Sequence, residues 1–241
     1  MSQIRGKFAD TYDRFVRRES LLPEGLSRLI ASTGAKDILE MGVGTGSVAV
    51  GLRLEGYDIT GVDRSRDMLR QAASKTKKHS VKLRLVEDNI VTVDLNRQFD
   101  LTLCLGNTLP LVTGLRDSRK LFENCARHLK PGGFLIIQNL NYDRIMDSRP
   151  ATFAVDLLDD LIRIKQYRYG HPLIEFVISL IDTAVIPPKI TVSRNRLRPW
   201  TKKALSNELK AAGFSKIRAY GDYRKNRFRQ NSKDLVIICQ R

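Results

Sequence analysis

The stretch that most constrains the fold is 37-DILEMGVGTGSVAVGL-52. An apolar run reaches an acid, Glu40, and then three glycines that alternate with other residues, Gly42, Gly44 and Gly46. Glycine has no Cβ, so it tolerates positive φ and lets the backbone approach a ligand closely. The pattern predicts a strand, a tight turn and the start of a helix. We therefore expect a ligand to bind at this turn.

The 241 residues can bury one core, and we expect a single domain over residues 1–241 with one insertion. A hydrophobic content of 42% and a charged content of 28% are ordinary for a globular protein. The longest uncharged run, 101-LTLCLGNTLPLVTGL-115, contains Asn, Thr, Gly and Pro and is too short to span a bilayer. No leader-like segment opens the chain, so we expect a cytosolic protein without a membrane partner.

Cysteine and histidine are few and scattered, which argues against metal chemistry. The three cysteines have apolar neighbours and are expected in the core: Cys104, Cys125 and Cys239. The three histidines show no ligand spacing and are expected to be structural or exposed: His79, His128 and His171. No metal site is predicted.

Strand-like and helix-like segments alternate over the first 140 residues, which predicts a parallel sheet with helices on both faces. The expected strands are 37-DILEM, 57-YDITGVD, 81-VKLRLVE, 99-FDLTLCL and 134-FLIIQNL, with a strand-helix-strand unit repeated four times. Ser65 is a candidate N-cap, and 130-KPGG-133 is expected to end the helix before the fifth strand. Ligands of such sheets bind beyond the carboxyl ends of the strands.

The pattern changes after Leu140. Residues 161–170, 173–182 and 189–198 are strand-like with no helix between them, and we expect an antiparallel insertion over residues 148–199. After the insertion we expect a helix that begins at Thr201 as its N-cap and ends at Gly213. Two further strands, 214-FSKIRAY and 234-DLVIICQ, complete the chain.

The glycines do not match the dinucleotide fingerprint G-x-G-x-x-G, because Ser47 stands where its third glycine belongs. The motif E-x-G-x-G-x-G resembles that of class I S-adenosylmethionine-dependent methyltransferases. The resemblance implies a Rossmann-like, doubly wound, mostly parallel seven-stranded sheet, with the antiparallel insertion covering the active site. It also implies S-adenosyl-L-methionine as cofactor. Its zwitterionic methionine part needs both backbone donors and acceptors such as Glu40.

Further cofactor residues follow the next two strands. Asp63 ends the second strand, where an acid can accept hydrogen bonds from ribose hydroxyls, although dinucleotide folds carry such an acid too. In 87-EDNI-90 the resemblance assigns Asp88 to the adenine amino group; the alternative is a turn or cap residue. The resemblance adds the neighbouring positions Arg64, Asn89, Ile90 and Leu105 to the cofactor site.

The residues nearest the transferred methyl group are expected in 104-CLGNTLPLV-112. Asn107 offers both a donor and an acceptor; alternatively it occupies a left-handed turn position. Segments 106–112, 139–145, 196–201 and 220–223 resemble the glycine/sarcosine N-methyltransferase-like branch. In that branch an N-terminal tyrosine reaches over the cofactor, which implies a catalytic role for Tyr12. The alternative is that Tyr12 packs on the core from an amphipathic helix.

The net charge of +16 lies mostly near the C-terminus: residues 189–241 hold 15 Lys+Arg and 3 Asp+Glu, or +12. Arg144, Arg149 and Arg198 are candidates for holding a substrate carboxylate or phosphate, or else form exposed salt bridges. We expect a small anionic or zwitterionic methyl acceptor, modified at nitrogen because no Asp/His pair offers a base for oxygen. The alternative is an RNA or protein acceptor bound by the basic region. The chain is expected to be a monomer or a homodimer.

Overall fold

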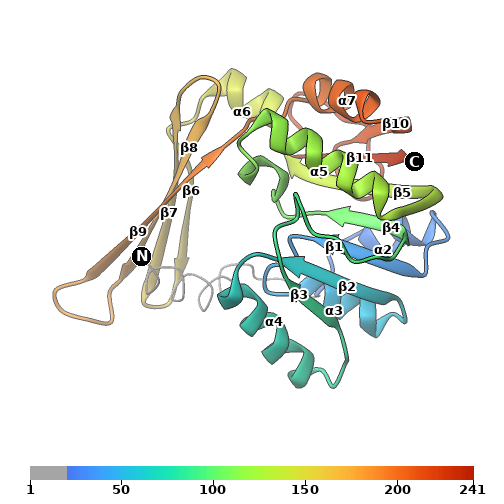
Figure 1. The fold of residues 1–241 in the computed structure, drawn as a ribbon. Coiled ribbons are helices and arrows are strands. Elements are labelled where there is room, and N and C mark those ends of the chain that lie inside the picture. Colours follow the sequence, from blue (N-terminus) through green and yellow to red (C-terminus); the bar gives the residue numbers. More distant parts are fainter. Residues whose placement is uncertain (1–20) are drawn as a thin grey trace.

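The computed structural model describes residues 21–241, apart from the side chain of Phe153. A seven-stranded sheet with the order β10-β11-β5-β4-β1-β2-β3 forms its centre (Figure 1). The strands are β1 (Asp37–Met41), β2 (Asp58–Asp63), β3 (Arg84–Glu87), β4 (Phe99–Cys104), β5 (Leu129–Leu140), β10 (Ser215–Tyr220) and β11 (Asp234–Gln240). Strands β1 to β5 pair in parallel, and β11 pairs antiparallel with both β5 and β10. The predicted mostly parallel seven-stranded sheet is confirmed.

Helices cover both faces of this sheet and bury separate clusters of apolar side chains against it. The helices are α2 (Leu26–Ala31), α3 (Ser47–Leu54), α4 (Arg66–Lys78), α5 (Leu115–Arg127) and α7 (Lys202–Ala211). Leu121 of α5 and Leu205 of α7 pack on one face, whereas Leu29 of α2 and Leu52 of α3 pack on the other. The chain leaves β1 toward β2 and later enters β4 on the opposite side, so the strand order reverses between β1 and β4. A reversal of this kind opens a crevice at the carboxyl edge of the sheet.

Local signals in the sequence place the helix ends. The Ser65 hydroxyl accepts a hydrogen bond from the Met68 amide at 3.4 Å, and the Thr201 hydroxyl accepts one from the Ala204 amide at 3.2 Å. Gly213 follows the last helix with a φ of 88°, which a residue with a Cβ adopts only with strain. Both predicted N-caps and the predicted helix stop are confirmed.

Two expectations about connections were wrong. No helix joins β3 to β4; the segment 88–98 forms turns instead, and its buried Val93 and Leu95 cover the sheet where a helix would lie. Strand-helix-strand units therefore occur three times and not four. The sequence 130-KPGG-133 does not end a helix either, because α5 stops at Arg127 and β5 already begins at Leu129, which pairs with Phe99.

A second sheet follows β5 and stands apart from the first one (Figure 1). Its antiparallel strands are β6 (Thr152–Leu158), β7 (Leu161–Tyr169), β8 (Ile174–Asp182) and β9 (Lys189–Leu197), reached through α6 (Tyr142–Ser148). Tyr142 and Ile145 of α6 pack against Tyr167, Ile174 and Leu197 on one face of this sheet. The predicted insertion is present as an antiparallel sheet, and the prediction missed α6 and β6.

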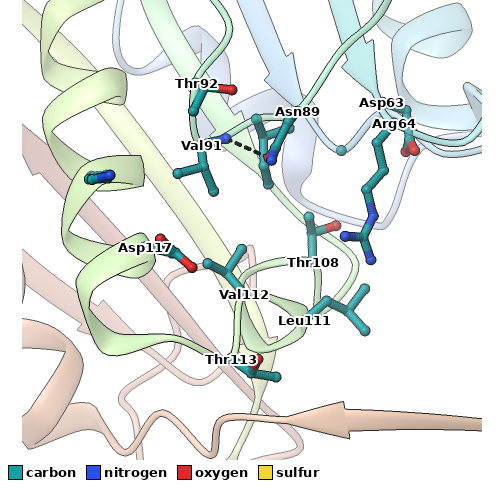
Figure 2. Close-up of a pocket in the computed structure, with 13 residues that line it drawn as sticks. Asp63, Arg64, Asn89, Val91, Thr92, Thr108, Leu111, Val112, Thr113 and Asp117 are labelled. Carbon is teal, nitrogen blue, oxygen red and sulfur yellow. Dashed lines mark hydrogen bonds between the residues drawn. The ribbon is translucent and has the colours of Figure 1, made fainter.

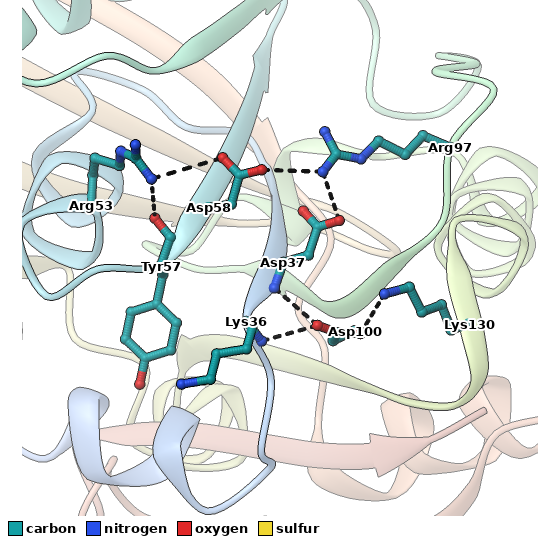
Figure 3. A network of polar contacts seen from close by, with 8 residues as sticks. All are labelled: Lys36, Asp37, Arg53, Tyr57, Asp58, Arg97, Asp100 and Lys130. Carbon is teal, nitrogen blue, oxygen red and sulfur yellow. Dashed lines mark hydrogen bonds and ion pairs between the residues drawn. The ribbon is translucent and has the colours of Figure 1, made fainter.

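A polar network joins the amino ends of the strands in the first sheet, opposite the glycine turn (Figure 3). Arg97 bridges Asp37 at 2.8 Å and Asp58 at 3.1 Å. Asp100 accepts hydrogen bonds from Lys130 Nζ at 2.7 Å and from the amides of Lys36 and Asp37 at 3.0 Å each. Burial acts to raise the pKa of Asp100, but these three bonds outweigh it and lower the pKa to about 2. The network holds the starts of β1, β2 and β4 together.

The cysteines and one histidine are core residues, as predicted. All three cysteines are buried, and burial raises the pKa of Cys104 and Cys239 to about 12. Buried His128 accepts a hydrogen bond from the Leu95 amide at Nε2, and its Nδ1 lies 2.9 Å from the Asn124 carbonyl oxygen. Within residues 21–241, no group of three His, Cys, Asp or Glu side chains is placed to hold a metal ion. No helix in the same range is long and apolar enough to span a bilayer.

Candidate active site

The glycine turn after β1 is built so that one of its glycines faces open space. Gly42, Gly44 and Gly46 have φ values of 83°, 55° and 74°. A Cβ at Gly42 would overlap the Thr108 side chain, and one at Gly46 would lie 2.8 Å from the Ala72 Cβ. A Cβ at Gly44 would meet no atom within 4 Å. Gly42 and Gly46 therefore allow close packing inside the protein, whereas Gly44 leaves room for a ligand.

Asp63 connects the glycine turn to the start of α4. Its Oδ2 accepts a hydrogen bond from the Gly44 amide, and its Oδ1 accepts one from the Ser65 amide, both at 2.9 Å. Each carboxylate oxygen keeps a second lone pair. Asp63 can thus fix the turn and still accept hydrogen bonds from a ligand hydroxyl. Glu40 lies just before the turn, is 4% exposed, and pairs in register with Gly61 on one side and Leu103 on the other.

A cavity of about 340 Å³ opens at the carboxyl edge of the sheet, beside this turn (Figure 2). Four segments line it: the glycine turn, the end of β2, the loop after β3 and the chain from the loop after β4 into α5. Of the predicted cofactor residues, the lining includes Gly42, Asp63, Arg64, Asn89 and Ile90. Its volume and mixed polar and apolar lining suit a small molecule.

The remaining predicted cofactor residues lie outside the lining: Glu40, Gly44, Gly46, Asp88 and Leu105. Leu105 is buried in the core. Asp88 is exposed, and its Oδ1 accepts a hydrogen bond from the Asn89 amide at 2.6 Å, which is the turn-residue geometry that the sequence left open. Asn89 in turn accepts from the Val91 amide at 3.0 Å (Figure 2), so the loop after β3 is held by its own side chains.

The sequence identified only the first part of the cavity wall that follows β4: the predicted segment 104–112 includes Thr108, Leu111 and Val112, whereas Thr113, Asp117 and Lys120 were missed. This wall runs from Thr108 through a 3₁₀ turn, η1 (Leu109–Leu111), and the residues after it into the first two turns of α5, where Asp117 and Lys120 lie. Figure 2 shows Asp117 across the cavity from Asp63 and Arg64. Pro110 and Gly114 predict a turn in this segment, but the sequence does not show that the turn lies opposite the end of β2. Arg198 fixes this wall, because its Nε donates to the Thr113 carbonyl and its amide donates to the Pro110 carbonyl, both at 2.8 Å.

The loop that starts this wall is tied to β5 by two side chains. Asn107 has a φ of 63°; its Nδ2 lies 3.0 Å from the Tyr142 hydroxyl, and its Oδ1 accepts from the Leu140 amide at 3.1 Å. Gln138 Oε1 accepts from the Gly106 amide at 2.8 Å, and Gln138 Nε2 donates to Asp234 at 2.9 Å. Burial raises the pKa of the Tyr142 hydroxyl, so it stays neutral. The sequence analysis did not identify Gln138. The only feature that distinguishes it in the sequence is that it is a polar residue within an apolar strand.

The three predicted substrate arginines do not gather at the cavity. Arg144 of α6 is half-buried and acts electrostatically on Tyr167 and Asp234. Arg149 is exposed at the end of α6, with a φ of 42°. Arg198 does not line the cavity itself but donates a hydrogen bond to Thr113 of the cavity wall. Tyr12, the predicted catalytic tyrosine, lies outside the described residues.

Comparison with known proteins gives consistent results. Residues 38–133, which contain the glycine turn and all the residues that line the cavity, match the family model of a methyltransferase domain. A glycine/sarcosine N-methyltransferase from Parasynechococcus marenigrum (strain WH8102) is 27% identical over 228 residues, which cover 91% of this chain and 78% of that protein.

Two solved structures share the fold. An S-adenosylmethionine-dependent methyltransferase from Clostridium acetobutylicum superposes with a TM-score of 0.84 at 21% identity, covering 98% of both chains. A SAM-bound amino pentose methyltransferase from Micromonospora echinaspora gives a TM-score of 0.69 at 17% identity, covering 91% of this chain and 92% of that one. Both likenesses include the second sheet, since the coverage exceeds nine-tenths of the chain.

Proposed function

We propose that this chain, a class I S-adenosylmethionine-dependent methyltransferase, transfers the methyl group to an amine nitrogen of a small acceptor that is anionic or zwitterionic. One observation carries the choice of acceptor. The similarity to a glycine/sarcosine N-methyltransferase covers 91% of the chain, and so includes the antiparallel insertion as well as the cofactor-binding half.

The residues of the site fit the cofactor. Gly44 faces open space that a Cβ would enter. Asp63 lies at the end of β2, and its carboxylate oxygens can each accept a further hydrogen bond from a ligand. In this proposal the glycine turn and Glu40 hold the methionine part, Asp63 and Arg64 hold the ribose, and the loop of Asn89 and Ile90 holds the adenine. S-adenosylmethionine, when bound, supplies an electrophilic methyl group on a positively charged sulfur.

The protein's own contribution to transfer is mainly alignment of the acceptor. The loop of residues 105–108 follows β4 at the carboxyl edge, and two residues of β5 hold it: Gln138 accepts from the Gly106 amide, and the Leu140 amide donates to Asn107. Asp234 starts β11 at the same edge, and burial raises the pKa of its carboxyl group against the hydrogen bond from Gln138. An amine must arrive neutral to react, and hydrogen-bond acceptors at this edge would orient its N–H groups. We propose that the loop and Asp234 provide these acceptors.

Positive charge on the second sheet favours an anionic acceptor. Asp156 of β6 is shared by Arg163 at 2.7 Å and Lys165 at 3.3 Å, both on β7. Burial, followed by the charge of Arg163, lowers the pKa of Lys165. Arg163, Lys165 and Tyr167 are every second residue of β7 and therefore share the face that packs against α6, where Arg144 also lies. We propose that residues 148–199 cover the acceptor and that this face presents cations to it.

The alternative acceptor is RNA or a protein bound by the basic C-terminal region. Several of its cations are exposed on the segment between β10 and β11, namely Arg224, Lys225, Arg227, Arg229 and Lys233. Arg224 is paired with Glu24 and Lys225 donates to Ser32, so part of this charge is used within the fold. Binding of a polyanion would weaken steeply with salt because condensed counterions are released.

The acceptor class can be tested with methyl-labelled S-adenosylmethionine and a panel of glycine, sarcosine, amino sugars, their hydroxyl analogues and bulk RNA. We expect label in amines that carry a carboxylate or phosphate. Arg144→Gln should raise KM for such acceptors several-fold with little change in kcat, whereas the matched change at exposed Arg149 should have a smaller effect. Label in RNA alone, or in the hydroxyl analogues alone, would refute the proposal.

A further inference from the structure

The second sheet has one apolar face that nothing in the described part of the chain covers. Its strands alternate, and the side chains that pack on α6, such as Tyr167 and Leu197, belong to one face only. On the opposite face, Leu157, Ile162, Ile181 and Ile190 pair in register to form a row across all four strands. The next row contains Val155, Ile164, Ser179 and Val192. We call these two rows, with Val185 and Ile186 of the adjoining β8–β9 loop, the outer patch.

The outer patch is exposed to an extent that is unusual for aliphatic side chains. Leu157 is 74% exposed, Ile190 63% and Ile186 97%. Of the nine large hydrophobic residues that are exposed in residues 21–241, six belong to the outer patch: Val155, Leu157, Val185, Ile186, Ile190 and Val192. Their exposed fractions correspond to on the order of 600 Å² of apolar surface, the upper end of what a monomer presents in one patch.

We propose that the outer patch is a homodimer interface, in which the outer patches of two copies of this chain pack face to face around a two-fold axis. Two such patches would bury on the order of 1,200 Å² in total, which reaches the size of a specific, stable interface. An interface around a two-fold axis must be complementary to itself. An uncharged aliphatic surface meets that requirement without pairing like charges.

The charge distribution selects this way of packing two copies over the others. The chain carries a net charge of +16, so two copies repel unless they meet where charge is absent. The charged part of the same face, with Arg168, Glu175, Arg194 and Arg196, lies toward the other end of the strands. A two-fold axis through the outer patch keeps these arginines of the two copies apart.

Pairing through the sheet edges is disfavoured by the same reasoning. At one edge, β9 carries Lys189, Arg194 and Arg196, all exposed, and two β9 strands side by side would bring these cations together. At the other edge, β6 has an irregular register between Thr152 and Ala154 that interrupts regular pairing. Face-to-face packing uses neither edge.

The test is sedimentation velocity on the full chain at concentrations from roughly 1 to 100 μM, because dimer formation depends on protomer concentration. We expect a species of twice 27.4 kDa whose dissociation constant does not increase with salt. Changing Leu157→Lys together with Ile190→Lys should raise the dissociation constant at least about 100-fold, because charges would enter an apolar interface. Leu54→Lys is the matched control: Leu54 is 54% exposed at the end of α3, outside the patch, and the variant should stay dimeric.

A milder pair, Leu157→Thr with Ile190→Thr, keeps residue types suited to strands and should weaken the dimer in the same direction. Circular dichroism and S-adenosylmethionine binding confirm that each variant is folded. A 27.4 kDa species at every concentration would overturn the proposal, as would an unchanged dimer in folded variants of both kinds. The outcome is independent of the acceptor proposed above, because the assay measures mass and not methyl transfer.

Discussion

The carboxylate of Asp63 accepts a hydrogen bond from the amide of Gly44 at 2.9 Å and thereby ties the end of β2 to the glycine turn after β1. The same carboxylate also accepts from the Ser65 amide at the start of α4. One side chain therefore holds the glycine turn, the end of β2 and the start of α4 together. Its removal should disturb both the shape of the turn and the contact with the ligand.

Asp63→Ala should weaken S-adenosylmethionine binding by about 1–3 kcal/mol, the cost of losing hydrogen bonds to a charged group. Asp88→Ala is the comparison, since Asp88 is exposed and does not line the cavity. We expect a smaller loss for Asp88, measured by isothermal titration calorimetry. Equal losses would mean that the adenine end of the site reaches Asp88, and no loss for Asp63 would contradict the cofactor placement.

Gly44→Val should abolish cofactor binding, because the new side chain would fill the open space beside the turn. Gly34→Val is the control. Gly34 has a φ of 72° and Gly44 one of 55°, and a Cβ added at either position would meet no atom within 4 Å. Gly34 differs in that it follows α2, away from the glycine turn. Both variants carry backbone strain of about 1–2 kcal/mol. Loss of binding in both would trace the effect to folding and not to the site.

Gln138→Leu should lower kcat about tenfold and leave S-adenosylmethionine affinity within a few-fold, because it releases the loop of Gly106 without touching the glycine turn. Gln98→Leu, which removes an exposed glutamine that donates to the Arg127 carbonyl, is the control. Single-turnover kinetics separates the two effects. A large change in cofactor affinity with unchanged kcat would show that Gln138 acts on the cofactor side.

Local signals predicted the parts of the fold that depend on neighbouring residues. Ser65 and Thr201 cap their helices by contacts within three residues, so the sequence pattern suffices to place them. The partners of Asn107 could not be found in this way, since Tyr142 is 35 residues away and is brought to Asn107 by the pairing of β4 with β5. The absence of a helix between β3 and β4 could not be predicted for a similar reason. Val93 and Leu95 cover the sheet from irregular backbone, and such backbone leaves no periodic pattern of apolar residues in the sequence.

The residues that line the cavity also fall into two groups, those that local sequence patterns predict and those that only the fold brings there. Asp63, Asn89 and Ile90 stand at strand ends and could be identified from their place after apolar runs. Asp117 and Lys120 lie on the first turns of α5 and face the cavity only because η1 folds back, held by Arg198 from beyond the second sheet. Contacts over such sequence separations are set by topology, and a single sequence does not display them.

Asp100 should make stability depend on pH at the acidic end. Its folded pKa is about 2, below the ordinary value of 3.8, so its contribution is fully present above about pH 4 and is lost as the pH falls toward 2. Asp100→Asn should therefore lower the unfolding free energy by about 1–2 kcal/mol at pH 7, and by much less near pH 2. Urea denaturation at several pH values measures the difference. A difference that stays constant from pH 7 to pH 2 would contradict the assigned role of the Lys130 bond.

The proposed N-methyltransferase activity is best measured as transfer of labelled methyl groups from S-adenosylmethionine to a defined amine, with the product identified by mass spectrometry. We expect N-methylated product from a small amine that bears an anionic group, none from its hydroxyl analogue, and loss of activity in Gly44→Val. We also expect a rate that changes little with salt, since a small acceptor held by few charges releases few counterions. Methylation of RNA or protein in the same assay, steeply weakened by salt and without any methylated amine, would contradict the proposed activity.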